Sequence, residues 1–488
     1  MFRKQYTIKI NLPGGIVSAG ELYAVVMAAE RARVPNMQLG TRQQLFCKVA
    51  DQYAPAFLAG LEQAGIPFEA NEEKYPNILS SYVTEGIFTT QSWVSEGLYK
   101  DILGAFDYKP RLKINLVERS QSFVPFFTGN INFISSDIGN YWHLYVRWPQ
   151  TTQLHPVKNL IGSEDIPRIS RVIEEAMLYE GITTLDALQS ALRQKGPFAT
   201  QPVKEPLRGS AFDLPYYEGF NRWGNRTWLG IYRREELFPL AFLRDICLVC
   251  LDTRIGQLYT TPWKSLIIKG IEDKDRGLWE YIMGKYRINL RHASNELNWQ
   301  IEDLNEEGLR LKRYLVRQFD LDDVRTEGLC FAIKTRPRSG LSGSVIIRRQ
   351  EGGAAGQRKT LDRYDILHTP DFNANSKEYI LYREGLEKEN LAVYLVSLCK
   401  SFYEQRSSRE PTPLTPPART ASPDRSGTAQ VFRCRHCLTR YDEQYGDPDA
   451  GQPAGTPFQQ LPPDYTCPVC DSGRADFERI EKTAYDTV

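Results

Sequence analysis

The sequence predicts an α+β protein in which a large duplicated body is followed by a linker and a small metal-binding module. Three observations lead to this fold class. Strand-like and helix-like segments alternate over residues 8–69, and a similar alternation returns at residues 228–268. A proline-rich stretch covers residues 405–429, and two C-x-x-C pairs follow it.

Length and composition limit the classes of function. A chain of 488 residues, with 41% hydrophobic and 25% charged residues, predicts two or three globular domains. Because the formal net charge is only +1, we expect neither nucleic acid nor an acidic membrane as a partner. No apolar run reaches the length of about 18 residues that spans a bilayer, and residues 1–10 lack the apolar region of a signal peptide. Nine cysteines, four of them in the C-terminal pairs, leave an odd five, which favours a reducing, cytoplasmic location.

The body begins with a strand–helix–strand–helix unit. Its expected elements are a strand at 8–12, a helix at 19–32, a strand at 37–46 and a helix at 54–64. A related unit has strands at 228–232 and 256–268 around a helix at 237–251. Because the spacing between the two units is about 220 residues, we expect an internal duplication.

The motifs of this body resemble a known enzyme family. They are Leu12-Pro13-Gly14-Gly15 with Leu39-Gly40-Thr41-Arg42-Gln43 in the first unit, and residues 258–268 in the second. They are similar to the paired ferredoxin-like half-domains of the nitrite/sulfite reductase family. Residues 76–81 and 110–115 resemble that family's first, cysteine-free catalytic-type domain. The resemblance covers about residues 5–400 and weakens after Lys269. It implies a half-domain at 1–75, a reductase-like middle domain at 76–205, a second half-domain at 206–275 and a degenerate second reductase-like domain at 276–404.

The resemblance implies two cofactors, a siroheme and a [4Fe–4S] cluster that shares a cysteine with the haem iron. Arg42 matches a basic family position that neutralises siroheme carboxylates, and its counterpart in the second unit is expected at the uncharged Tyr259. The cluster patterns C-x5-C and C-x3-C are absent from the sequence. The positions where we expect them carry the wrong chemistry, namely His292, Asn298, Arg336 and Gly340. We therefore expect a body without siroheme or cluster.

Five cysteines remain in the body, and we expect them to fill core positions. Cys247 and Cys250 share one face of an apolar helix, where a thiol switch is the alternative. The others, on or beside apolar segments, are Cys47, Cys330 and Cys399. The basic residues of this part could grip an anion or lie on a solvated loop; they are Arg336, Arg338, Arg348 and Arg349.

A linker is expected at residues 405–429, where five prolines stand among Ser, Thr and Arg residues. Such a segment cannot bury enough surface to fold. It would hold the C-terminal module at a high effective concentration near the body, as a built-in electron donor requires. A passive spacer would have the same composition.

The C-terminal pairs are Cys434 with Cys437 and Cys467 with Cys470, separated by 29 residues. Together they can close a tetrahedral tetrathiolate site around either Zn or Fe. Zinc would make a redox-inert clamp, whereas a single iron would make a one-electron carrier. The two pairs by themselves leave both metals open.

The residues between the pairs resemble rubredoxin. The string runs through Tyr441-Asp442, Gly446-Asp447-Pro448, Gly455-Thr456-Pro457-Phe458 and Asp464-Tyr465-Thr466. The similarity covers residues 430–482, the whole length of a rubredoxin. It implies one iron, cycling between the ferric and ferrous states, held by Cys434, Cys437, Cys467 and Cys470.

Two departures from rubredoxins stand directly after the cysteine pairs. Rubredoxins usually carry glycine there, and this chain carries Leu438 and Asp471. A positive φ is tolerable for Asp and costly for Leu, so we expect local strain at Leu438. The charge of Asp471 should favour the ferric state. We expect His436 to be an exposed side chain, and aromatic residues to keep water from the metal: Phe432, Tyr441, Phe458, Tyr465 and Phe477.

The leading hypothesis is a one-electron carrier whose rubredoxin module is tethered to a non-catalytic, nitrite/sulfite reductase-like docking scaffold. Its partner would be a redox protein of nitrogen or sulfur assimilation. One alternative is an active siroheme-type reductase fed by its own rubredoxin. The other is an interaction protein stabilised by zinc.

Overall fold

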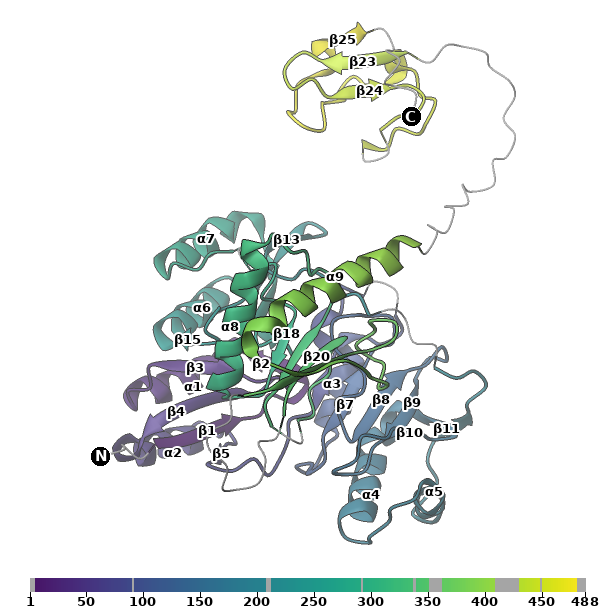
Figure 1. The fold of residues 1–488 in the computed structure, drawn as a ribbon. Coiled ribbons are helices and arrows are strands. Elements are labelled where there is room, and N and C mark those ends of the chain that lie inside the picture. The colour runs from purple at the N-terminus through teal and green to yellow at the C-terminus, as the bar shows by residue number, and fades with distance from the viewer. Residues whose placement is uncertain are drawn as a thin grey trace. The chain divides into compact units, whose positions relative to one another are not determined.

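The computed structural model describes residues 5–89, 92–207, 212–290, 293–336, 339–350, 362–408, 430–447 and 450–480. The chain forms two compact units, Met1–Ser408 and Arg409–Val488 (Figure 1). The larger unit mixes helices and sheets, and the smaller one is a short sheet with loops, which confirms the predicted α+β class. Most of the expected linker lies outside the described residues. Helix α9 (Leu391–Ser408) continues into its first four positions, so the linker prediction began too early.

The first sheet of the body is antiparallel and contains the N-terminal strand. Its strands, in order, are β15 (Phe238–Pro239), β3 (Asn36–Leu39), β4 (Leu45–Ala50), β1 (Gln5–Ile10) and β5 (Glu69–Ala70). Its helices are α1 (Ala19–Arg31) and α2 (Ala54–Gln63). A capping box starts α1, because the Ser18 side chain accepts from the Glu21 N–H and the Glu21 carboxylate accepts from the Ser18 N–H.

The second sheet is built in the same way. Its strands, in order, are β13 (Gly219–Trp223), β14 (Arg226–Ile231), β17 (Leu266–Ile271), β16 (Gln257–Thr260) and β2 (Ile16–Ser18), and its helices are α6 (Leu240–Asp252) and α7 (Arg276–Lys285). Each sheet takes an edge strand from the other half: β15 pairs with β3, and β2 pairs with β16. Helices α1 and α6 contribute to one shared apolar core, so the two halves are interlocked.

The backbone confirms the predicted duplication. Two non-glycine residues with positive φ, Arg33 and Gln43, recur 221 positions later as Arg254 and Lys264. This register corrects the expected counterpart of Arg42. Strand β16 ends at Thr260, and the turn that follows it places Trp263, not Tyr259, in the position of Arg42.

The duplication extends to two further sheets. The third contains β12 (Thr200–Pro202), β11 (Asn159–Gly162), β9 (Tyr141–Val146), β8 (Ile131–Ser135), β7 (Ile114–Val117) and β6 (Leu79–Ser80), with β10 (His155–Pro156) beside β9. The fourth contains β18 (Trp299–Ile301), β19 (Phe331–Lys334), β20 (Val345–Arg349), β21 (Tyr364–His368) and β22 (Ile380–Leu386). In each sheet three parallel strands lead into antiparallel ones. The accompanying helices are α3 (Glu96–Gly104), α4 (Ile166–Leu178), α5 (Leu185–Gln194), α8 (Glu306–Leu321) and α9.

Within the part of the chain that the structure describes, no helix combines the length and apolar character needed to cross a membrane.

The C-terminal module is a three-stranded antiparallel sheet with a small core. Strand β23 (Val431–Cys434) lies between β24 (Arg440–Asp442) and β25 (Phe477–Ile480). Its core residues are Phe432, Cys434, Tyr441, Phe458, Leu461, Tyr465, Cys467 and Phe477.

Candidate metal centre

Two loops of the C-terminal module bring its four cysteines together. Their Sγ atoms all lie within 4.8 Å of one another. The Sγ–Sγ distance is 3.6 Å between Cys434 and Cys470 and 3.4 Å between Cys437 and Cys467. A tetrahedron of thiolates about 2.3 Å from a metal has edges of roughly 3.8 Å. The four sulfurs therefore fit one four-coordinate metal ion, and no other such group of ligand side chains is found among the described residues.

The two cysteine loops have the same backbone hydrogen bonds. In the first, the Leu438 N–H donates to the Cys434 carbonyl (2.9 Å), and the Cys434 N–H donates to the Thr439 carbonyl (2.8 Å). The second repeats both bonds with Asp471, Cys467 and Ser472, at 2.9 and 2.8 Å. The φ angle is 64° at Leu438 and 59° at Asp471, which confirms the predicted positive φ at both positions.

Replacing Leu438 by glycine is expected to stabilise the metal-loaded module by about 1 kcal/mol. A left-handed backbone costs an L-residue roughly 1–2 kcal/mol, and the substitution removes this cost. Glycine loses more conformational entropy on folding, which offsets roughly 0.5–1 kcal/mol of the gain. Leu438 has little packing to lose, because it is 60% exposed. Thermal unfolding followed at the metal absorption band measures the effect. Val469→Gly is the matched control: Val469 is 69% exposed without a positive φ, so its loss should destabilise. A melting temperature for Leu438→Gly no higher than that of the parent would contradict the expected strain.

The predicted aromatic shell closes the inner side of the site. Cys434 and Cys467 are fully buried against it, while Cys437 and Cys470 are half-buried. The ring of Phe458 stacks on that of Phe432 at 4.1 Å between centroids. Water is thus excluded from one side of the metal position, and two thiolates remain near the surface.

Hydrogen bonds prepare these thiols to bind a metal. The Thr439 hydroxyl lies 3.0 Å from the Cys437 Sγ and lowers the pKa of that thiol to about 6. The Cys437 N–H lowers the pKa of Cys434. The Ser472 hydroxyl, 3.0 Å from the Cys470 Sγ, acts in the same sense, but burial, and then hydrogen bonding with Cys437 and Cys434, raise the pKa of Cys470 to about 11. Metal binding must therefore release at least the proton of Cys470.

The side chains around the open side of the site are exposed. His436 is 63% exposed, with its Nε2 3.6 Å from the Asp476 carboxylate, which confirms the expected exposed side chain. Leu438 and Val469, which are adjacent in sequence to the half-buried cysteines, give this side an apolar character.

Arg42, the predicted siroheme contact, is buried in the body. Its Nε and Nη2 donate to the Asn77 carbonyl, Nη2 also donates to the Ile114 carbonyl at 2.8 Å, and Nη1 donates to Asn115 Oδ1 at 3.1 Å. Burial, and then the charge of Arg147, lower its pKa to about 9. Most of its donors thus serve the protein itself, and its contact with a siroheme carboxylate stays a prediction.

Among the described positions expected for cluster ligands, Asn298 and Arg336 lie apart. Asn298 directly precedes β18 and Arg336 follows β19, so the two lie at opposite ends of a parallel strand pair. Gly340 lies in the loop after β19, and His292 is outside the described residues. The other five cysteines are buried in the hydrophobic cores of the body, where burial raises the pKa of each thiol. This confirms that they fill core positions.

A group of four half-buried cations, missed in the sequence, lies in the body. Its members come from both repeats: Lys113, Arg147, Lys334 and Lys377. No described acidic side chain pairs with any of them within 4 Å, and the buried Nε of Arg147 has no hydrogen-bond partner. Burial and neighbouring cations lower the pKa of Lys377 to about 7 and those of Lys113 and Lys334 to about 8. Such a group can neutralise a multivalent anion. Arg348 and Arg349, by contrast, pair with Asp365 and Glu307.

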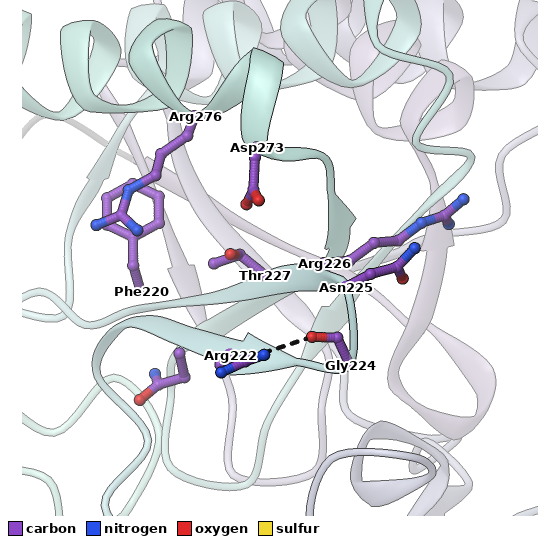
Figure 2. Close-up of a pocket in the computed structure, with 9 residues that line it drawn as sticks. Phe220, Arg222, Gly224, Asn225, Arg226, Thr227, Asp273 and Arg276 are labelled. Carbon is purple, nitrogen blue, oxygen red and sulfur yellow. Dashed lines mark hydrogen bonds between the residues drawn. The ribbon is translucent and has the colours of Figure 1, made fainter. Parts of the chain in front are cut away.

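A pocket of about 430 Å³ lies between the β13–β14 hairpin and the start of α7. Figure 2 shows the residues that line it. Arg276 lies over the Phe220 ring at 5.1 Å and pairs with Glu280 at 2.9 Å. Arg226 lies 3.9 Å from Glu272. Because its arginines are half-exposed and partly paired, this pocket is a weaker candidate than the four thiols.

Comparison with known proteins identifies the C-terminal module. The family model for rubredoxin matches residues 431–477. The high molecular weight rubredoxin of Moorella thermoacetica is 40% identical over 81 residues, 16% of this chain and 35% of that protein. Rubredoxin-2 of Rhodococcus erythropolis is 42% identical over 52 residues, and Rubredoxin-2 of Pseudomonas aeruginosa is 46% identical over 50 residues. These matches cover 11% and 10% of this chain and 82% and 91% of the relatives.

The body has a structural relative of its own. The NirA protein of Mycobacterium tuberculosis superposes with a TM-score of 0.62, covering 83% of this chain and 82% of that one. This likeness confirms the fold predicted for the body. With 15% sequence identity it shows the fold alone.

Proposed function

Because the C-terminal module of this chain belongs to the rubredoxin family, we propose that the protein transfers single electrons through one iron held by Cys434, Cys437, Cys467 and Cys470. The observation that supports this most directly is the convergence of four thiol groups within 4.8 Å in the matched module. When bound, the iron supplies a ferric/ferrous couple.

The protein residues would make this couple usable. The buried pair Cys434 and Cys467 anchors the ligands in the core, and the aromatic shell excludes water from the inner side. The half-buried pair Cys437 and Cys470 lies near the surface, next to exposed apolar side chains. A partner docked on this open side would approach the metal through short thiolate paths.

For the body, we propose a non-catalytic docking scaffold rather than a complete reductase. The five buried cysteines stand apart from any group of metal ligands in the described residues, so a [4Fe–4S] cluster does not fit them. The hydrogen bonds of Arg42 to the Asn77 and Ile114 carbonyls and to Asn115 fit a structural role. The scaffold would bring the rubredoxin to a redox protein, by fold analogy one of nitrogen or sulfur assimilation in the cytoplasm.

A second candidate for the body is supported by the four cations. An active siroheme-type reductase must hold a polycarboxylate cofactor, and Lys113, Arg147, Lys334 and Lys377 supply unpaired positive charge in one place. Bound siroheme would supply the redox chemistry there. The missing cluster thiolates argue against this candidate.

Metal analysis and the visible spectrum of the purified full chain test these proposals. The expected result is one iron per chain, thiolate-to-iron bands that bleach on one-electron reduction, and no haem absorption. A siroheme band or acid-labile sulfide would favour the reductase. Stoichiometric zinc after growth in iron-replete medium would favour the zinc-stabilised interaction protein.

Asp471→Gly is expected to raise the reduction potential of the site. Asp471 directly follows the ligand Cys470, and its negative charge opposes the extra negative charge of the ferrous state. Because the side chain is exposed and screened, we expect an effect of up to about tenfold in the ferrous-to-ferric ratio, or 59 mV. A potentiometric titration at low salt measures it, with Asp464→Gly, at a residue that is also exposed, as the control. An unchanged potential would contradict the expected influence of this carboxylate.

A further inference from the structure

Two side-chain hydroxyls contact the sulfurs of the proposed iron site. The Thr439 Oγ1 lies 3.0 Å from the Cys437 Sγ, and the Ser472 Oγ lies 3.0 Å from the Cys470 Sγ. Both hydroxyls thus meet the half-buried member of their own cysteine pair. The fully buried Cys434 and Cys467 have no such hydroxyl among the described contacts.

The local backbone explains why both cysteine loops have this contact. Each hydroxyl belongs to the second residue after its C-x-x-C pair. The residue between has a positive φ, 64° at Leu438 and 59° at Asp471, which turns the chain back toward the sulfur. The carbonyls of Thr439 and Ser472 then accept from Cys434 and Cys467, and these bonds hold both residues in position. Two separate segments of the chain therefore have the same arrangement.

The direction of these hydrogen bonds follows from the chemistry of the ligands. A thiol could either donate or accept, but a thiolate bound to a metal has no proton to give. In the metal-loaded protein, each hydroxyl must donate to its sulfur. No other acceptor is found for either hydroxyl among the described residues.

We propose that Thr439 and Ser472 are potential-setting residues that stabilise the ferrous state of the site by donating O–H···S hydrogen bonds to Cys437 and Cys470. This inference rests on the proposed iron-based electron transfer. Reduction adds one electron from the redox partner without making or breaking a bond. The electron increases the negative charge on the four sulfurs, so a donor to sulfur stabilises the reduced state more than the oxidised state.

The test is a potentiometric titration of the iron-loaded full chain carrying Thr439→Val or Ser472→Ala. Valine keeps the shape of threonine and removes the hydroxyl. Each variant is expected to lower the ferrous-to-ferric ratio at a fixed potential by about tenfold, which is about 59 mV for one electron. The double variant should lower it by about a hundredfold, because the two bonds act on different sulfurs. The thiolate-to-iron absorption should move to longer wavelength, since an unbonded thiolate donates charge more readily.

Two variants separate this effect from a general loss of structure. Thr439→Ser keeps the hydroxyl and should keep the parent potential. Thr456→Val removes a hydroxyl of the same module that donates to the Pro453 carbonyl at 2.7 Å, and it should leave the potential unchanged. Potentials of Thr439→Val and Ser472→Ala equal to that of Thr456→Val would overturn the inference. A parent protein without reversible iron reduction would instead contradict the proposed function.

Discussion

Replacing Cys467 by alanine is expected to abolish iron binding and to unfold the C-terminal module. Cys467 is fully buried and belongs to the core of the module, so the change removes both a metal ligand and core packing. A module of this size has a marginal core, and a metal at a four-ligand site contributes on the order of 10 kcal/mol to folding. Three thiolates leave the metal open to water and exchange. Iron content, the visible bands and amide hydrogen exchange over residues 430–480 measure the loss.

The same substitution in the body provides the control. Cys399 on α9 is also buried, with 2% exposure, but it takes part in no group of metal ligands. Cys399→Ala should keep one iron per chain and cost the body roughly 1 kcal/mol through a small cavity. One iron retained in Cys467→Ala would contradict the assignment of the four ligands.

The metal centre was largely predictable because its ligands are encoded locally. A C-x-x-C pair forms one tight loop whatever surrounds it, and the residues between the pairs specify the small aromatic core. The same local logic predicted the positive φ of Leu438 and Asp471, since the loop needs a left-handed residue directly after its second cysteine. The hydroxyls of Thr439 and Ser472 stand at matching positions of the two loops, so their contacts with the cysteines could also have been predicted from the sequence.

The group of four cations in the body was less predictable because its residues come from distant segments. Lys113 precedes β7, Arg147 follows β9, and Lys377 lies between β21 and β22, so no sequence spacing relates them. Only the packing of two sheets from different repeats brings such residues together. The counterpart of Arg42 was misplaced for a related reason. Its turn begins where β16 ends, and strand ends are the least certain feature of a sequence pattern.

The exchange of edge strands had no sequence signal either. Strand β2 is three residues long and β15 is two, too short for periodicity to show. Their pairing with the opposite half joins two sheets that look independent in the sequence. This interlocking makes the first and second half-domains one folding unit around a shared core, so neither is expected to fold alone.

The group of four cations should make the stability of the body depend on pH in an unusual direction. Lys377 has a folded-state pKa of about 7, and Lys113 and Lys334 have values of about 8, against 10.5 in an unfolded chain. Below about pH 7 both states hold these protons, and the folded state bears the full cost of the buried charges. Above the folded pKa values, the folded state releases protons that the unfolded state still binds. The free energy of unfolding should therefore rise from about pH 7 to about pH 10, by up to about 1.4 kcal/mol per pH unit for each lysine.

Tryptophan fluorescence can follow the unfolding of the body at each pH in the full chain. All eight tryptophans lie in the body, between Trp93 and Trp299, and the C-terminal module has none. Lys377→Met should stabilise the body at pH 7 by about 1 kcal/mol or more and should reduce the slope with pH. Lys274→Met, at a 74%-exposed surface lysine paired with Glu272, should leave both unchanged.

A multivalent anion gives the sharpest form of this test, because it should replace the missing counter-charge. Asp303, bonded to Thr41, and Glu302, bonded to Thr335, act on Lys113 and Lys334 from a distance, and neither forms an ion pair with them within 4 Å among the described residues. Inorganic pyrophosphate at 100 times its dissociation constant should add about 2.7 kcal/mol at pH 7. It should add much less at pH 10, where the three lysines are neutral, and at pH 7 it should add less to Lys377→Met than to the parent. Equal stabilisation at both pH values, or in both variants, would show that the anion acts elsewhere on the chain.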